Sequence, residues 1–162
     1  IKVVIKVMGT AQGVGFLLGI AMVVTLPAWA QTANFGSLTL GAEKTSGSLT
    51  GSTGGSTSLP AIIGSSDQNN NKCLGFGDPN PDHILVLEQD FPQLRLRVNS
   101  GGMDTTLIVQ GSDGSIRCGD DLSETNKDAG ITASDWKTGK YKVWVGSAVP
   151  GVRRDYTLSI RR

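Results

Sequence analysis

Two short acidic stretches hold the side chains best suited to bind a cation. Aspartate and asparagine alternate in the first, and carboxylates share a polar loop in the second. The residues are Asp78, Asn80 and Asp82 in the first stretch and Asp120, Asp121 and Glu124 in the second. Calcium binds about six to eight oxygens, several from carboxylates, although neither stretch follows the order of an EF-hand. Calcium is therefore the candidate cofactor. The alternative is that these side chains only cap turns and hydrate the surface.

One strand carries the side chains best suited to contact a ligand. If the apolar residues that alternate with Trp144 face a core, its indole shares the outer face of the strand with Lys140 and Lys142. A flat aromatic ring beside cations can stack on a sugar or pack against an acidic protein. Arg95 and Arg97 extend this face if their strand belongs to the same sheet. The alternative is that a loop, or a Gly/Ser-rich segment, folds over Trp144, because large aromatic side chains are mostly buried.

Catalytic chemistry is not indicated. His83 is the sole histidine, so any Ser-His-Asp or Cys-His site would have to use it. It follows a Pro-Asp pair and begins an apolar strand, where a hydrogen-bonded structural role is more common. The sequence contains no G-x-S-x-G nucleophile motif, and no second acid stands out to form a glycosidase pair with Asp120 or Asp121. We expect a protein that is not an enzyme.

The first thirty residues are typical of a secretory signal peptide. Lys2 and Lys6 supply a positive start, residues 14–26 form an apolar run, and residues 27–30 (PAWA) place alanines where a signal peptidase cleaves. We expect cleavage after residue 30 and export to the periplasm or beyond the cell. The alternative is a retained membrane anchor, since residues 7–30 are just long enough to span a bilayer.

The charge balance excludes two classes of partner. Removal of Lys2 and Lys6 from the 15 Lys and Arg leaves 13 cationic side chains against 14 Asp and Glu in a mature chain that starts at Gln31. A nearly neutral chain without a basic run favours neither nucleic acid nor an anionic membrane surface.

The two cysteines are expected to form a disulfide. Cys73 and Cys118 would meet in an oxidising compartment after export. The bridge would close a loop of about 45 residues and stabilise the fold by roughly 3–4 kcal/mol. It would also draw the loops of Asp78 and Asp120 together, so that one calcium site uses both. The alternative is a pair of free buried thiols. Two cysteines and one histidine do not make a structural zinc site.

Residues 31–72 differ in composition from the remainder of the mature chain. Residues 35–40 are predicted to form a strand, and residues 59–63 a second short one. Between them, residues 46–58 (SGSLTGSTGGSTS) have the composition of a linker or a flexible edge. We therefore separate an N-terminal segment, 31–72, from a domain formed by residues 73–162.

The domain of residues 73–162 is predicted to be all-β. Alternating or continuous apolar positions predict the strands, and residues 111–114 (GSDG) predict a hairpin turn. The predicted strands are 83–88, 94–98, 105–110, 115–118, 140–145 and 156–160. Residues 120–131 are expected to form a long polar loop. Short strands at near-regular spacing, with no convincing helix, predict an antiparallel β-sandwich of two sheets.

Residues 83–160 resemble the bacterial pre-peptidase C-terminal (PPC) domain family. The motifs that carry the resemblance are LRLRV at 94–98, DTTL at 104–107, Gly114, CGDD at 118–121, GKYKVWVG at 139–146 and YTLSI at 156–160. With Cys73 and residues 81–85, the mature chain is similar to stand-alone exported members, many from cyanobacteria. The resemblance covers about half of the chain well. It implies a jelly-roll-like sandwich with a non-catalytic role in binding, secretion or stabilisation of partners, in some members with calcium and with collagen or polysaccharide as ligand.

These observations lead to one expected function and two alternatives. The first is an exported binding module for an extracellular polysaccharide or surface protein, with Trp144 at the contact face and calcium in the acidic loops. The second is a structural, self-assembling subunit of a surface layer or fibre, in which residues 35–40 add to a neighbour's sheet edge. If that segment pairs within its own chain, strand exchange loses its donor. A third, implied only by the family, is an inhibitor or chaperone of an exported protease.

Overall fold

The computed structural model describes residues 32–162. The predicted signal peptide, residues 1–30, lies outside the described residues, as does Gln31 at the predicted mature N-terminus. No helix within residues 32–162 is long and apolar enough to cross a membrane.

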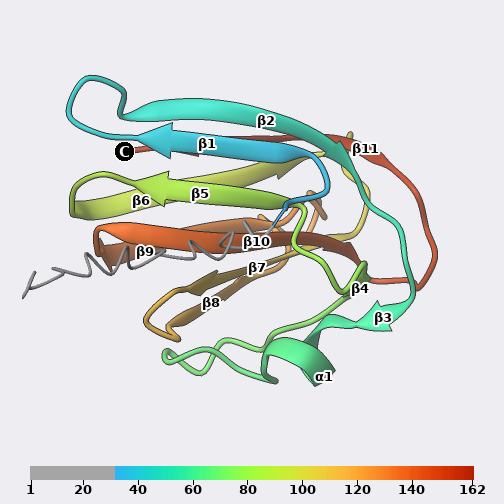
Figure 1. Ribbon diagram of the computed structural model, residues 1–162. Coiled ribbons are helices and arrows are strands. Elements are labelled where there is room, and N and C mark those ends of the chain that lie inside the picture. Colours follow the sequence, from blue (N-terminus) through green and yellow to red (C-terminus); the bar gives the residue numbers. More distant parts are fainter. Residues whose placement is uncertain (1–31) are drawn as a thin grey trace, which may run out of the picture. The chain divides into compact units, whose positions relative to one another are not determined.

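Two β-sheets make up the fold (Figure 1). The seven-stranded sheet A contains β1 (Gly36–Leu40), β3 (Thr57–Ser58), β4 (Phe76–Gly77), β5 (His83–Leu87), β7 (Thr105–Gly111), β8 (Ile116–Gly119) and β10 (Gly139–Ser147). The four-stranded sheet B has the order β2 (Ser46–Ser52), β11 (Asp155–Arg161), β6 (Phe91–Asn99) and β9 (Gly130–Trp136). Every strand pair is antiparallel except β1–β5, which is parallel. The predicted all-β, two-sheet sandwich is therefore confirmed.

The main core lies between the two sheets and follows from the alternation in the sequence. On β6, the side chains of Leu94, Leu96 and Val98 are buried, whereas those of Arg95 and Arg97 are exposed. Successive side chains of a strand point to opposite faces of the sheet, so these leucines meet the inward residues of sheet A. The main core is one continuous cluster that draws on both sheets.

A second, smaller cluster covers the opposite face of sheet A. We call it the outer cluster, and its buried members are Leu59, Cys73, Ile108, Cys118 and Trp144. On β7, Leu107 and Val109 point into the main core while Ile108 points into the outer cluster. This face is covered by residues 57–75, the covering segment, which begins as β3 at the end of sheet A and continues over the face as α1 (Leu59–Ile63) and a loop (Figure 1).

Residues 59–63 form a helix, so the predicted second strand is wrong. Pro60 lies in the first turn of α1, and its carbonyl accepts a hydrogen bond from the Gly64 amide at 3.1 Å. A proline in the first turn suits a helix because its missing N–H would have no partner there. A short apolar run fits a strand or a helix equally well. Leu59 sets the orientation of α1 on sheet A, because its side chain is buried in the outer cluster.

The Gly/Ser/Thr-rich tract contributes an edge strand rather than a loose linker. Strand β2 pairs with β11 over its full length, and β1 pairs with β5, so the N-terminal segment and residues 73–162 share both sheets. Gly51 shows why a glycine is needed here. A Cβ atom at this position would lie 2.6 Å from the Tyr156 hydroxyl and 2.8 Å from the Phe35 ring.

The predicted central hairpin is present as β7 and β8. Ile108 pairs with Cys118, and the Gly111 amide donates to the Ser115 carbonyl at 2.8 Å across the turn. Gly114 has φ = 83°, a left-handed conformation that glycine adopts at little cost.

Strand β9 was not predicted, because its first residues fall in the expected polar loop. Its buried residues, Ile131 and Trp136, are five positions apart and do not show the two-residue period. The alternation breaks at Asp135, which has φ = 58°. This irregularity turns Trp136 into the main core, where it is fully buried.

Candidate functional site

The predicted contact face around Trp144 does not exist. The Trp144 side chain is only 4% exposed and packs in the outer cluster, and its indole Nε1 donates a hydrogen bond to the Pro79 carbonyl at 3.3 Å. Lys140 is exposed, but Lys142 is half-buried. The prediction of an exposed Trp144 is wrong because the covering segment packs over the outer face of sheet A. This indole is a core residue and is not accessible for stacking on a ligand.

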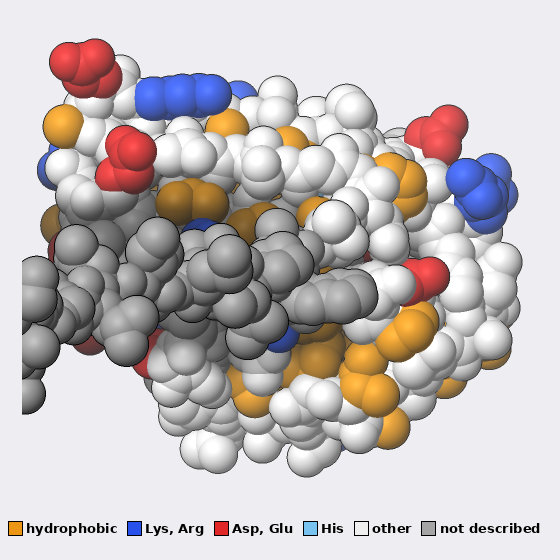
Figure 2. Space-filling model, viewed as in Figure 1, with side chains coloured by type: hydrophobic (Ala, Val, Ile, Leu, Met, Phe, Trp, Pro, Cys, Tyr) orange, Lys and Arg blue, Asp and Glu red, His pale blue; other side chains and the backbone are white. Residues whose placement is uncertain are grey.

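Arg95 and Arg97 do not extend the face that carries the two lysines. Both arginines are exposed, but they lie on β6 of sheet B, whereas Lys140 and Lys142 lie on β10 of sheet A. On the side of the molecule in Figure 2, charged side chains are scattered among polar atoms rather than gathered in a patch. The predicted five-residue binding face is therefore divided between the two sheets.

The first acidic stretch serves the fold. Asp78 Oδ1 accepts a hydrogen bond from the Asn80 amide at 2.8 Å, as a turn-capping aspartate does. Asp82 is 5% exposed, and its Oδ2 accepts from the Val145 amide at 2.8 Å. Burial raises the pKa of Asp82 to about 7, against the effects of the hydrogen bonds from Val145 and Asn34. A carboxyl so deeply enclosed is a structural acceptor.

The second acidic stretch gains a member that the sequence analysis missed. Asp104, at the start of the hairpin, brings its carboxylate to within 4.8 Å of those of Asp120 and Asp121. Burial, followed by the charges of Asp121 and Asp104, raises the pKa of Asp120. Lys127 forms an ion pair with Asp121. Three carboxylates therefore face one ammonium group, which leaves an excess of negative charge.

The two acidic stretches do not form one site. Within residues 32–162, the carboxylates that come together are those of Asp104, Asp120 and Asp121. Asp78, Asp82 and Glu124 do not belong to this group. Asp78 and Asp82 instead line a small pocket of about 230 Å³ with Asn34 and residues 52–55. The prediction that the disulfide merges the two loops is wrong, because Asp78 is not among the carboxylates that come together near Asp120.

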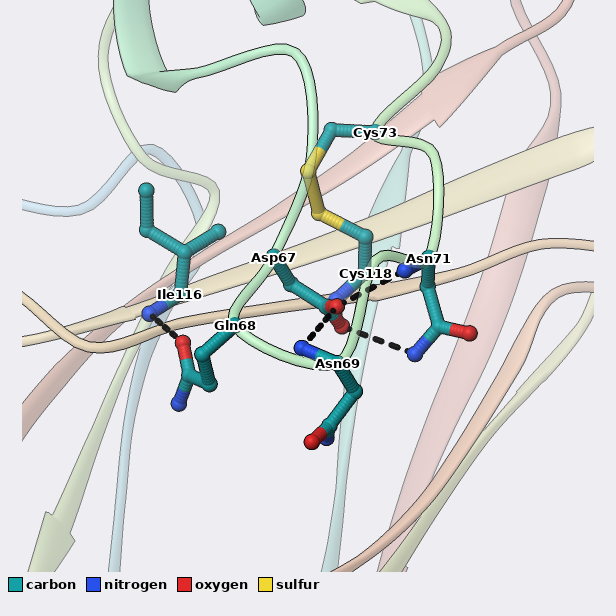
Figure 3. Close-up of a disulfide and its surroundings, with 7 residues drawn as sticks. All are labelled: Asp67, Gln68, Asn69, Asn71, Cys73, Ile116 and Cys118. Carbon is teal, nitrogen blue, oxygen red and sulfur yellow. Dashed lines mark hydrogen bonds between the residues drawn. A yellow bond between two sulfur atoms is a disulfide. The ribbon is translucent and has the colours of Figure 1, made fainter.

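The predicted disulfide between Cys73 and Cys118 is present (Figure 3). It joins the covering segment to β8, and both cysteines are nearly inaccessible, at 2% and 6% exposed. The loop before Cys73 is fastened to the same strand by side chains. Asp67 Oδ2 accepts a hydrogen bond from the Cys118 amide at 3.2 Å, and Gln68 Oε1 accepts from the Ile116 amide at 2.9 Å. These two acceptors take the place of a neighbouring strand along the outer edge of β8.

Asp67 is the centre of this loop. Its carboxylate also accepts hydrogen bonds from the amides of Asn69 and Asn71 at 2.8 and 2.9 Å and from the Asn71 side chain at 2.9 Å (Figure 3). Burial would raise the pKa of Asp67, but these hydrogen bonds outweigh it and lower the pKa below 3.8. Several donors around one carboxylate give the loop a single shape.

A groove of about 430 Å³ lies beside the disulfide. We call it the disulfide groove. Its first wall is the loop at residues 67–74, its second comprises β8 and the residues that follow it, 117–121, and its third is β9 at residues 130–133. Leu74 is 41% exposed and offers an apolar contact, and Asp120 and Asp121 place two carboxylates in the lining. Its volume falls within the range of about 300–1,000 Å³ typical of ligand pockets.

Arg117 braces the groove and was not predicted. Its guanidinium lies 4.1 Å from the centre of the Trp136 ring, and it donates to the backbone carbonyls of Ser134 and Asp135 at 3.4 and 3.0 Å. This residue joins β8 of sheet A to β9 of sheet B. The sequence does not indicate that Arg117 connects the two sheets, because the carbonyls that accept its hydrogen bonds lie 17 and 18 residues away.

His83 lies inside the protein. Its side chain is fully buried, and its Nε2 lies 2.9 Å from the Tyr156 hydroxyl. Among residues 32–162, its Nδ1 has no hydrogen-bond partner. Burial lowers the pKa of His83 to about 4, so the ring is neutral at pH 7. Burial also raises the pKa of Tyr156. The arrangement links β5 to β11 and has no access to a substrate.

No family model matches this sequence, and no curated protein matches it. Among solved structures, the pre-peptidase C-terminal domain of collagenase from Bacillus anthracis is similar at 13% identity and a TM-score of 0.44, over 77% of this chain and 94% of that domain. Aeromonas hydrophila PliG, a periplasmic inhibitor of g-type lysozyme, is similar at 14% identity and a TM-score of 0.42, over 77% of this chain and 96% of PliG. Neither likeness assigns a function to this chain.

Proposed function

We propose that this protein is an exported, non-catalytic module that binds a surface protein outside the cytoplasm, with the disulfide groove as its contact site. The observation that carries the proposal is the groove itself. Three segments distant in the sequence line it, and the disulfide, Asp67 and Arg117 hold its walls. Preformed walls reduce the ordering cost of binding.

A protein partner is favoured over a polysaccharide because the tryptophan and tyrosine side chains within residues 32–162 are hidden. Trp136, Trp144, Tyr141 and Tyr156 are all at most 4% exposed. Sugar rings are commonly bound by a flat aromatic face, which none of these residues presents. Phe35 is 41% exposed, but it lines other pockets, outside the disulfide groove.

Calcium is proposed to strengthen binding through the acidic residues beside the groove. Asp104, Asp120 and Asp121 provide three carboxylates close together, and calcium would complete its shell with backbone oxygens, water or oxygens of the partner. Lys127 competes with a cation for Asp121. We therefore expect weak calcium affinity in the free protein and higher affinity in the complex.

Export is proposed on two grounds. Residues 1–30 have the features of a signal peptide, and a structural disulfide suits an oxidising compartment. Intact-mass measurement of the exported protein should give a chain that begins at Gln31. Retention of residues 1–30 would contradict cleavage.

The binding function is tested by retention of cell-surface protein and insoluble polysaccharide on the immobilised protein, with calcium and with a chelator. Leu74→Ser alters the groove, and Val149→Ser is its control because Val149 is also exposed, at 57%. We expect surface protein to be retained by the wild type and the control and released by Leu74→Ser. Retention of polysaccharide alone would show that the partner is a polysaccharide and not a protein. If nothing is retained, the proposal of a binding module is wrong. Retention that is unaffected by the chelator would show that calcium does not contribute to binding.

The self-assembling subunit is disfavoured by one observation. Strand β1 pairs with β5 of its own chain from Gly36 to Leu40, so this segment is not free to complete a neighbour's sheet. We expect a monomer at micromolar concentration in analytical ultracentrifugation, and a concentration-dependent oligomer would restore the alternative.

A further inference from the structure

One wall of the disulfide groove is the open edge of a β-sheet. Strand β9 is an edge strand of sheet B, and β6 is the strand of that sheet with which it pairs. In an antiparallel pair, backbone groups point alternately toward the partner strand and away from it. The Val98 amide donates to the Ala129 carbonyl, whereas the Gly130 amide donates away from β6, to the Asp120 carbonyl at 3.0 Å. The outward set on β9 is therefore Gly130, Thr132 and Ser134.

One backbone group at each end of this edge is already bonded, whereas neither backbone group of the middle residue is. Asp120 accepts the Gly130 hydrogen bond at one end, and Arg117 binds the Ser134 carbonyl at the other. Within residues 32–162, neither the N–H nor the C=O of Thr132 makes a hydrogen bond, and the residue is exposed and lines the groove. An edge residue whose N–H and C=O are both open can pair with one residue of an incoming strand.

The opposite wall cannot compete for this role. The outer edge of β8 is closed by Asp67 and Gln68, whose side chains accept from the Cys118 and Ile116 amides (Figure 3). A segment that enters the groove therefore finds a free backbone N–H at Thr132 on β9, whereas the outward N–H groups of Ile116 and Cys118 on β8 are already bonded. This difference between the two edges means that an incoming strand would add to sheet B through β9.

The lining also favours a particular side-chain chemistry. Asp120 and Asp121 line the side where β8 ends, the Asp104 carboxylate lies close to both, and Lys127 pairs with Asp121. The lining also holds Lys72 and Arg117, and the Arg117 guanidinium is bound to backbone carbonyls. Leu74 and the half-buried Ala133 supply an apolar surface. A segment with one basic and one apolar side chain complements both.

We propose that the groove binds an extended segment of the partner protein as an added strand on β9. The segment pairs with the backbone N–H and C=O of Thr132 and places a lysine or arginine side chain against Asp120 and Asp121. This inference rests on the proposed function and deepens it by specifying the chemistry of the partner. This binding mode differs from aromatic stacking and from the docking of a folded domain, because backbone hydrogen bonds contribute to its affinity.

The test uses a proline at each edge of sheet B. Thr132→Pro removes an outward N–H without removing a hydrogen bond to β6, and edge strands tolerate proline in this situation. Thr50→Pro on β2 is the matched control. The Thr53 amide donates to Arg154 beside β11, so by alternation the Thr50 N–H points away from the sheet, and Thr50 is exposed as Thr132 is.

The probe is a random heptapeptide display library selected on the purified protein, followed by synthesis of the enriched peptides. We expect enriched sequences with a lysine or arginine, affinity about tenfold lower for Thr132→Pro, and unchanged affinity for Thr50→Pro. The double variant Asp120→Asn/Asp121→Asn should weaken basic peptides and not their glutamine analogues. If Thr132→Pro fails to fold, N-methylation of alternate amides in the peptide removes the same hydrogen bonds from the other side.

Three outcomes would overturn the added strand: no enriched peptide, enrichment of acidic peptides, or affinity unchanged by both Thr132→Pro and N-methylation. The broader function is judged separately, by retention of surface protein. If Thr132→Pro retains surface protein as well as the wild type does, the proposed binding module stands and only the added strand on β9 is rejected.

Discussion

The main core and the outer cluster bury apolar side chains by different means. The main core joins inward residues from strands of both sheets, each one of an alternating series. The outer cluster joins three buried residues on the far face of sheet A, Ile108, Cys118 and Trp144, to Leu59 and Cys73 of the covering segment. Its contacts depend on α1, the disulfide and Asp67 rather than on a repeated pattern. A sheet face can thus be closed by a segment whose sequence shows no strand periodicity.

This difference predicts unequal stability in the two regions. Many strands must separate to expose the main core, whereas release of residues 57–75 alone exposes the outer cluster. Such satellite clusters can open locally at a lower free energy than global unfolding.

A matched pair of leucine truncations gives the largest effect. Leu158 in the main core and Leu59 in the outer cluster are both fully buried. Leu158→Ala should lower the free energy of global unfolding by about 3–5 kcal/mol, because it leaves a cavity between two sheets. Leu59→Ala should change global unfolding less and speed amide hydrogen exchange in residues 57–75. Equal losses of global stability in urea unfolding would mean that the two clusters form one cooperative unit.

The disulfide is the next test. Replacement of both cysteines, Cys73→Ser with Cys118→Ser, should lower the free energy of unfolding by about 4 kcal/mol, since the bridge spans 45 residues. The serine pair keeps nearly the same volume. Limited proteolysis should then cut residues 64–73 first, while the sandwich stays intact. Cleavage within β6 or β11 before this loop would contradict the separation.

Asp82 and His83 predict a pH dependence that appears when only one of them is removed. From about pH 4 to 6.5, folded Asp82, with a pKa of about 7, is neutral, as is folded His83, with a pKa of about 4. In the unfolded chain both side chains are charged. The two residues together therefore bind one proton in the folded state and one in the unfolded state, so the free energy of unfolding does not change with pH over this range. Asp82→Asn leaves His83, and stability should rise by roughly 3 kcal/mol over this range. His83→Gln leaves Asp82, and stability should fall as pH rises.

Urea unfolding at several pH values measures these slopes. Both signs follow from the pKa shifts: a raised carboxyl pKa favours folding at low pH, and a lowered imidazole pKa favours folding at high pH. Identical slopes for Asp82→Asn and the wild type would show that His83 keeps an ordinary pKa in the folded protein.

Asp67 gives the smallest effect and the opposite sign to Asp82. Its pKa is lowered, so its contribution is present above about pH 4 and is lost as pH falls below 3.8. Asp67→Asn should lower stability at pH 7 by about 1 kcal/mol, because the amide retains some acceptor capacity. The loss should shrink as the pH falls below 3.8. Hydrogen exchange of the Cys118 amide reports the local change, and a loss of equal size at pH 2 and 7 would contradict it.

Prediction succeeded where neighbours in the sequence decide the outcome. The alternating leucines of 94–98 and the GSDG turn at 111–114 reflect local rules for strands and hairpins, and both are present. Prediction failed for β9, whose period breaks at Asp135, and for α1, whose five residues are too few to show a helical period. In the site, Cys73 and Cys118 were paired correctly because no other cysteine competes.

The all-β fold class, the inward face of most strands and the disulfide could be predicted from the residues alone, because these depend on two-residue periodicity and on a single possible cysteine pair. The folded chain was needed to show that Trp144 is covered, that Asp104 joins Asp120 and Asp121, and that Thr132 keeps an open N–H and C=O in a groove. These two groups of features differ because they depend on interactions of different range along the chain. A strand pattern records which face is apolar, but whether that face meets solvent or another segment depends on residues far along the chain.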